Sequence, residues 1–226
     1  MNLHWYQWMA IMALGACLIS CLFHFIRLIS LGKPNDFSRP AARTGDSIRY
    51  AFTGAMSPAK KESAYLHLPT YTAGLFYHMG TFLSFFLFFF ILMDMLPQGW
   101  LAVIIIAFLV ISSISGITIF IKRMVKKELR FLSNPDDFIS NILVTSFQIL
   151  TLIYILNPQI LQSPNPQILQ SPNPQIQLSY YLIFTLLMLY TPVGKLRHMI
   201  YFFAARYHLG YFFGRRGVWP AGKVKN

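Results

Sequence analysis

The chain is poor in charged residues and in cysteine. Only 12% of its 226 residues are charged, and seven residues are acidic. A soluble globular chain typically carries about 25% charged residues, so this scarcity argues against a soluble protein. Cys17 and Cys21 are the only cysteines, and no second pair completes a zinc or iron–sulfur site. We interpret them as small packing residues, and we expect any iron–sulfur chemistry to belong to a partner.

Long apolar runs take the place of the missing charges. Hydrophobic residues make up 55% of the sequence and aromatic residues 16%. A transmembrane helix needs about 20 mostly apolar residues. The first run is too long for a removable signal peptide, and it lacks the basic start and the small-residue cleavage site of one. The sequence predicts an all-α integral membrane bundle of five helices in one domain over residues 1–226, with spans at 5–31, 69–96, 100–121, 138–156 and 178–203.

Lysine and arginine are missing from three segments that five spans would place on one side of the membrane. These segments are residues 1–4, 96–99 and 157–177. The 19 basic residues cluster instead on or near the other side, in 32–66, in 122–137 and from Lys195 onward, with Arg27 in the first span. By the positive-inside rule the N-terminus is expected outside and the C-terminus in the cytoplasm. The net charge of +12 is then a topology signal and not a sign of nucleic-acid binding.

The connecting segments differ in character. The predicted external loop 157–176 consists of the repeat NPQILQSP, whose proline density favours extended backbone. We interpret it as an expanded loop without a catalytic role. The loop 32–66 is long enough to dock a soluble subunit. The basic loop 122–137 either anchors to lipid headgroups or meets an acidic partner.

Two of the six histidines have surroundings that suit a haem. His78 lies in the second span and His198 in the fifth, where an imidazole is costly unless it is used. Small residues let a flat macrocycle approach a helix, and cations can neutralise propionates. We predict that the pair supplies both axial ligands of one haem iron. The alternatives are histidines that bond neighbouring helices and cations that reach lipid headgroups. The residues that flank the pair are Gly74, Gly80, Lys195 and Arg197.

The expected depths of the two histidines differ. At 1.5 Å per residue, His198 lies about 30 Å from Leu178 along a straight helix, and His78 lies about 14 Å from Pro69. A kink at Pro192, or helices that extend past the membrane, would reconcile the two depths. In either case the haem is expected in the cytoplasmic half of the membrane.

The segments around both histidines resemble the gamma subunit of respiratory nitrate reductase, a five-span cytochrome b with its N-terminus outside. The segment from Leu75 to Gly80 (LFYHMG) is similar to the family's Leu-Phe-His-x-Gly ligand motif on helix two. The segment from Tyr190 to His198 (YTPVGKLRH) is similar to its Pro-x5-His motif on helix five. The chain also resembles the membrane subunits of sulfite-reductase-associated and heterodisulfide-reductase-like complexes. The likeness in sequence is confined to helices two and five.

The resemblance implies a haem b subunit in a prokaryotic cytoplasmic membrane. Such a subunit transfers electrons between membrane quinone and a cytoplasmic iron–sulfur protein and has no terminal substrate site of its own. The nitrate reductase subunit holds a second, outer haem, but Phe88 and Tyr180 occupy the corresponding positions here. One haem is therefore expected. His67 and His208 leave open a second haem on the inner side.

Two other classes of function remain open. A haem-free membrane anchor that recruits a soluble oxidoreductase complex would use His78 and His198 only for helix packing. A transporter is disfavoured, because the sequence shows no inverted repeat and no other charged residue deep in a span. Asp94, the only acid on the predicted outer side, is either a proton acceptor for quinol or a solvated carboxylate.

Overall fold

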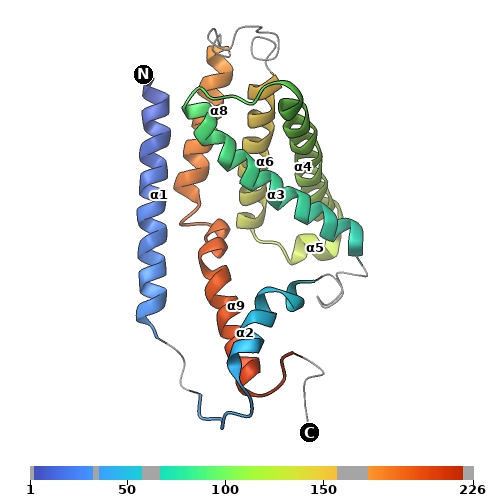
Figure 1. Ribbon diagram of the computed structural model, residues 1–226. Coiled ribbons are helices and arrows are strands. Elements are labelled where there is room, and N and C mark those ends of the chain that lie inside the picture. Colours follow the sequence, from blue (N-terminus) through green and yellow to red (C-terminus); the bar gives the residue numbers. More distant parts are fainter. Residues whose placement is uncertain (1–2, 33–35, 58–66, 157–172, 221–226) are drawn as a thin grey trace. The chain divides into compact units, whose positions relative to one another are not determined.

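A computed structural model of the chain describes residues 3–32, 36–57, 67–156 and 173–220 (Figure 1). Every regular element within these ranges is a helix, which confirms the all-helical prediction there. Most of the predicted external repeat, residues 157–172, lies outside the described residues.

Among the described residues, four helices are long and apolar enough to cross a membrane. A fifth span exists only if α8 (Pro174–Tyr190) and the helix that follows it are counted as one broken span. By length and composition the chain is therefore a membrane protein, with four or five candidate spanning helices in the part that the structure describes. The four continuous spans are α1 (Trp5–Ser30), α3 (Leu68–Leu92), α4 (Gly99–Val125) and α6 (Pro135–Leu156).

The predicted fifth span, residues 178–203, is not one continuous helix. The helix α8 ends at Tyr190, and a turn and the short 3-10 helix η3 (Lys195–Arg197) precede α9 (His198–Arg215). Pro192 contributes to the break, because it lacks the amide hydrogen that would bond the carbonyl oxygen four residues earlier, and its ring crowds that carbonyl. His198 is therefore the first residue of a new helix, and its depth cannot be counted along a straight helix from Leu178.

The chain divides into two compact units. The bundle unit comprises residues 1–18 and 69–196, and the α2–α9 unit comprises residues 19–68 and 197–226. In the bundle unit α6 packs between α4 and α8 (Figure 1). The helix α3 joins this group by a close contact, since a Cβ atom at Gly80 would overlap the side chain of Ser112 on α4.

The α2–α9 unit is built on the contact between α2 (Thr44–Phe52) and α9. Gly210 on α9 makes the close approach possible, because a Cβ atom there would lie 2.5 Å from the Cα atom of Ile48. Gly214, one turn later, meets Ser47 in the same way, at 2.6 Å from its Cβ atom. The hydroxyl of Ser47 in turn donates a hydrogen bond to the carbonyl oxygen of Trp219 at 2.5 Å.

Candidate functional site

His78 lies on a face of α3 that the other helices of the bundle unit leave uncovered. Its side chain is exposed. Gly74, four residues earlier, shares this face, and nothing in the unit lies within 4 Å of a Cβ atom built there. Gly80, two residues later, points to the opposite side and is filled by Ser112. The two glycines therefore differ: Gly74 borders open space beside the histidine, and Gly80 serves the contact between α3 and α4.

A buried hydrogen-bond network holds the backbone next to His78. Gln148 on α6 is fully buried, and its amide nitrogen donates to the carbonyl oxygen of Tyr77 at 3.0 Å and to the hydroxyl of Thr81 at 2.8 Å. The hydroxyl of Ser112 on α4 donates to the amide oxygen of Gln148 at 2.9 Å. One glutamine thus ties three helices together at the level of the candidate ligand.

Tyr77 adds a second link to α6. Its hydroxyl donates to the backbone carbonyl oxygen of Asn141 at 3.3 Å and accepts from the hydroxyl of Thr145 at 3.4 Å. Gly116 on α4 makes room for the Tyr77 ring. The residue that precedes His78 is therefore anchored on α6.

The other candidate histidines belong to the α2–α9 unit. His198 is exposed at the start of α9, directly after the exposed Arg197. His208 is exposed on the same helix, with its ring 6.3 Å from that of Phe212. His67 is exposed just before α3 begins. His78 thus belongs to the bundle unit, whereas His198 belongs to the α2–α9 unit.

His24 on α1 contacts a second helix. Its Nδ1 atom lies 3.4 Å from the hydroxyl oxygen of Tyr201 on α9, within the α2–α9 unit. This contact agrees with a packing role.

Lys195, a candidate contact for a propionate or a lipid headgroup, forms an ion pair with the buried carboxylate of Asp137. Arg123 at the end of α4 pairs with the same carboxylate at 2.8 Å. Asp137 also caps α6, because the backbone amide of Asn134 donates to its Oδ2 atom at 3.0 Å and Asn134 Oδ1 accepts from the Asp137 amide at 3.0 Å. This reciprocal capping box fixes the carboxylate where two cations converge.

Phe88 and Tyr180, the positions that the resemblance compares with outer haem ligands, lie in a packed aromatic cluster. Phe88 and Tyr180 are fully buried, and their ring centroids are 6.3 Å apart. Phe88 stacks on Phe184 at 3.6 Å, and Phe147 packs against Tyr180 at 5.6 Å. Side chains of α3, α6 and α8 thus fill the core of the bundle unit at this level.

A groove of about 620 Å³ lies near the other end of α3, where that helix meets the start of α4. Its wall is mainly apolar and includes Leu87, Phe90 and Leu101. Asp94 and Gln98 supply its polar groups. Asp94 has a φ angle of 55°, which Asp tolerates better than most residues. The groove therefore combines a long apolar wall with a carboxylate at one end.

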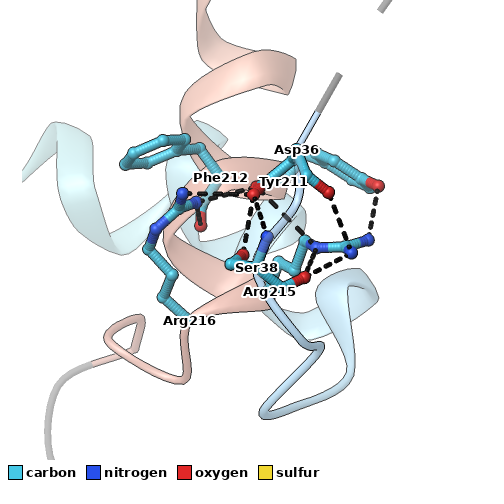
Figure 2. Close-up of polar contacts among 6 residues, drawn as sticks. All are labelled: Asp36, Ser38, Tyr211, Phe212, Arg215 and Arg216. Carbon is cyan, nitrogen blue, oxygen red and sulfur yellow. Dashed lines mark hydrogen bonds and ion pairs between the residues drawn. The ribbon is translucent and has the colours of Figure 1, made fainter. Parts of the chain in front are cut away.

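Figure 2 shows a polar cluster in the α2–α9 unit that joins the segment after α1 to the end of α9. The guanidinium of Arg216 donates to Asp36 Oδ2 at 3.0 Å and stacks 3.6 Å above the ring of Phe212. Arg215 donates to the carbonyl oxygen of Ser38 at 2.6 Å. The hydroxyl and amide of Ser38, followed by Arg216, lower the pKa of Asp36 from 3.8 to about 2 against the opposing effect of desolvation. We call Asp36, Ser38, Arg215 and Arg216 the terminal clasp.

Within the part of the chain that the structure describes, no three His, Cys, Asp or Glu side chains are grouped so that they could hold a metal ion. Haem iron takes its equatorial ligands from the porphyrin and needs only two axial side chains, so the proposed histidine pair is a different kind of site. Comparison with family models, curated proteins and solved structures gives no match.

The sequence interpretation did not single out Gln148, Tyr77 or Asp137. A glutamine inside a span is costly in hydrocarbon and is expected to bond within the protein, so Gln148 carried a readable signal. The segment Asn134-Pro135-Asp136-Asp137 carried another, since Asn followed by Pro is typical of a helix start. Nothing in the sequence identified their partners on other helices.

Proposed function

We propose that this chain is a haem b subunit of a prokaryotic cytoplasmic membrane complex that passes electrons between membrane quinone and a cytoplasmic iron–sulfur protein. The observation that carries the proposal is the setting of His78. Its imidazole is exposed on the open face of α3, while Gln148 and Tyr77 hold the adjacent backbone on the packed face. A ligand held on rigid elements, with room at its side, is what a haem site requires.

The residues near His78 fit a flat macrocycle on one side of α3. Gly74 leaves open space one turn from the imidazole, which would let a porphyrin edge approach the helix. His78 and His198 would hold the iron, and Arg197 would meet a propionate. Lys195 already pairs with Asp137, so it is the weaker candidate for a propionate. A bound haem would supply a one-electron carrier.

The aromatic cluster supports one haem instead of two. Phe88 and Tyr180 offer no imidazole, and their rings pack against Phe147 and Phe184 in the bundle core. A second macrocycle at this level would have to displace that packing, and overpacking or repacking a core typically costs about 1–3 kcal/mol or more.

The groove at Asp94 supports a contact with quinone. Its apolar wall suits an isoprenoid chain, and Asp94 with Gln98 could bond a quinone carbonyl or accept a quinol proton. With the N-terminus outside, this end of α3 faces the outer side. Along α3, Asp94 lies 16 residues from His78, about 24 Å at 1.5 Å per residue.

The test is a reduced-minus-oxidised spectrum of the purified full-length protein, with haem quantified per chain. We expect one haem b in the wild type and loss of the bis-histidine spectrum in both His78→Ala and His198→Ala. His208→Ala and His67→Ala are matched controls and should retain the spectrum. Two haems per chain, with one lost in these controls, would instead support a second inner haem.

A wild-type protein without haem would refute the electron-transfer proposal. The haem-free anchor would then be the better interpretation, and the α2–α9 unit would be its candidate platform for a soluble complex. Co-purification of the complex with both His78→Ala and wild type would distinguish an anchor from a failed preparation.

A further inference from the structure

A basic pocket of about 260 Å³ opens in the bundle unit where α4 ends and α6 begins. Lys122, Arg123 and Lys195 line it together with one carboxylate, that of Asp137. We propose that this pocket binds the phosphate of an anionic phospholipid headgroup. The proposal does not depend on haem and goes beyond the electron-transfer function.

The charge of the lining favours an anion. Three cations face a single carboxylate, so the lining carries a surplus of two positive charges. Arg123 and Lys195 both pair with Asp137. Lys122 donates to the hydroxyl of Thr70 on α3, a contact that brings no negative charge. A phosphate that enters the pocket would therefore meet cations from α4 and from the segment after α8, already held in place by the protein.

The depth of the pocket is that of a lipid headgroup. Lys122 and Arg123 are in the last turn of α4, Asp137 is in the first turn of α6, and Lys195 follows the end of α8. At this level apolar spans give way to polar residues, and lipid phosphates lie at the same depth. Basic pockets between spanning helices are a recurrent way to bind anionic headgroups.

The neighbouring helix α5 (Lys127–Phe131) favours a lipid over a free anion. Phe131 and Leu132 are 82% and 84% exposed, although they follow a strongly basic segment. Large apolar side chains exposed beside cations are typical of a segment that lies in the membrane interface. Leu129 and Leu132 also line the pocket, so an acyl chain would have an apolar path next to the phosphate site.

The experiment is native mass spectrometry of the full-length protein in detergent, titrated separately with phosphatidylglycerol and with phosphatidylcholine. We expect the wild type to bind phosphatidylglycerol more tightly. Lys122→Gln should weaken this binding about fivefold, the share expected of one interfacial cation. This substitution leaves the Asp137 ion pairs intact. Lys126→Gln, an exposed cation that does not line the pocket, is the matched control and should bind like the wild type.

Three results would overturn the proposal. Equal weakening in Lys122→Gln and Lys126→Gln would indicate general attraction to a basic surface. Equal affinity of the wild type for the two lipids would remove the preference for an anionic headgroup, and this comparison needs no variant to fold. Displacement of the lipid by millimolar inorganic phosphate would identify a site for free anions. Elution of each variant as a single species in size exclusion, and recovery of binding in Lys122→Arg, would show that the loss is local.

Discussion

At the scale of single residues, Gln148 has the most consequences for the bundle unit. Its side chain uses both polar atoms in bonds to three groups, on Tyr77, Thr81 and Ser112. An unsatisfied amide in an apolar interior is expensive, so the network stabilises the one arrangement of α3, α4 and α6 that satisfies it. The same bonds hold the turn of α3 that presents His78. Its role is to position this turn.

Replacing Gln148 by Leu should therefore loosen this turn without unfolding the protein. We expect a loss of about 1–2 kcal/mol in the free energy of unfolding, because interhelical hydrogen bonds within membranes are individually modest. The check is unfolding in mixed micelles monitored by circular dichroism. If haem is bound, its reduction potential should also shift, whereas a purely structural role elsewhere would leave the potential unchanged. Thr118→Val, which removes an exposed hydroxyl bonded only within α4, serves as the control.

At the scale of elements, the pairing of α2 with α9 depends on two glycines of α9, Gly210 and Gly214, which have no side chain to hold the helices apart. The hypothetical Cβ of Gly210 would collide with the backbone of α2, which cannot rotate away as a flexible side chain can. Two glycines one turn apart let the helices approach closely, as in small-residue contacts between membrane helices. The start of α6 is a second contact between elements. Asp137 caps this helix and also pairs with Arg123 at the end of α4 and with Lys195 after α8.

Gly210→Ala should separate α2 from α9. Overpacking of this kind costs about 1–3 kcal/mol, so limited proteolysis within α2 should become faster than in the wild type. Gly45→Ala is the matched control on α2, because nothing lies within 4 Å of its Cβ position and alanine favours helix by up to about 1 kcal/mol. Equal protection of α2 in Gly210→Ala and the wild type would show that this contact does not hold the helix.

At the scale of the whole molecule, the terminal clasp joins segments from opposite ends of the chain. Asp36 and Ser38 follow α1, and Arg215 and Arg216 end α9. The backbone amide of Ala41 adds a hydrogen bond to the carbonyl oxygen of Arg215 at 2.7 Å. A contact between segments so far apart in sequence closes a long loop, which costs conformational entropy. The contacts of the clasp offset this cost only when both segments are folded.

The clasp should make folding sensitive to acid. The pKa of Asp36 is lowered from 3.8 to about 2 in the folded protein. Its contribution to stability is therefore complete above the unfolded value of 3.8, and it is lost as the pH falls toward 2. The difference in thermal midpoint between the wild type and Asp36→Asn should shrink over that interval. A difference that stays constant as the pH falls would contradict this assignment. In an Arg216→Gln background the difference should be smaller at every pH, because one cation partner is gone.

Much of the fold could be predicted from local patterns. The four continuous spans begin and end within a few residues of the predicted boundaries, because apolar length alone decides whether a segment can cross hydrocarbon. The break at Pro192 is also local chemistry, but composition predicted one long apolar span there. For the candidate site, the sequence pattern singled out His78 and Gly74. The role of Gly80 in the contact between α3 and α4 depends on Ser112, a residue 32 positions away, and could not be predicted.

The sequence by itself determined that this is a helical membrane protein, where its apolar runs lie and at which ends its cations gather. These properties follow from the composition of each segment and from its contact with lipid or water. Only the tertiary structure decided that Lys195 pairs with Asp137, that Gln148 joins three helices, and that aromatic rings fill the level of Phe88. Those outcomes depend on which side chains meet across helices, and residues far apart in the chain carry no local signal of their partners.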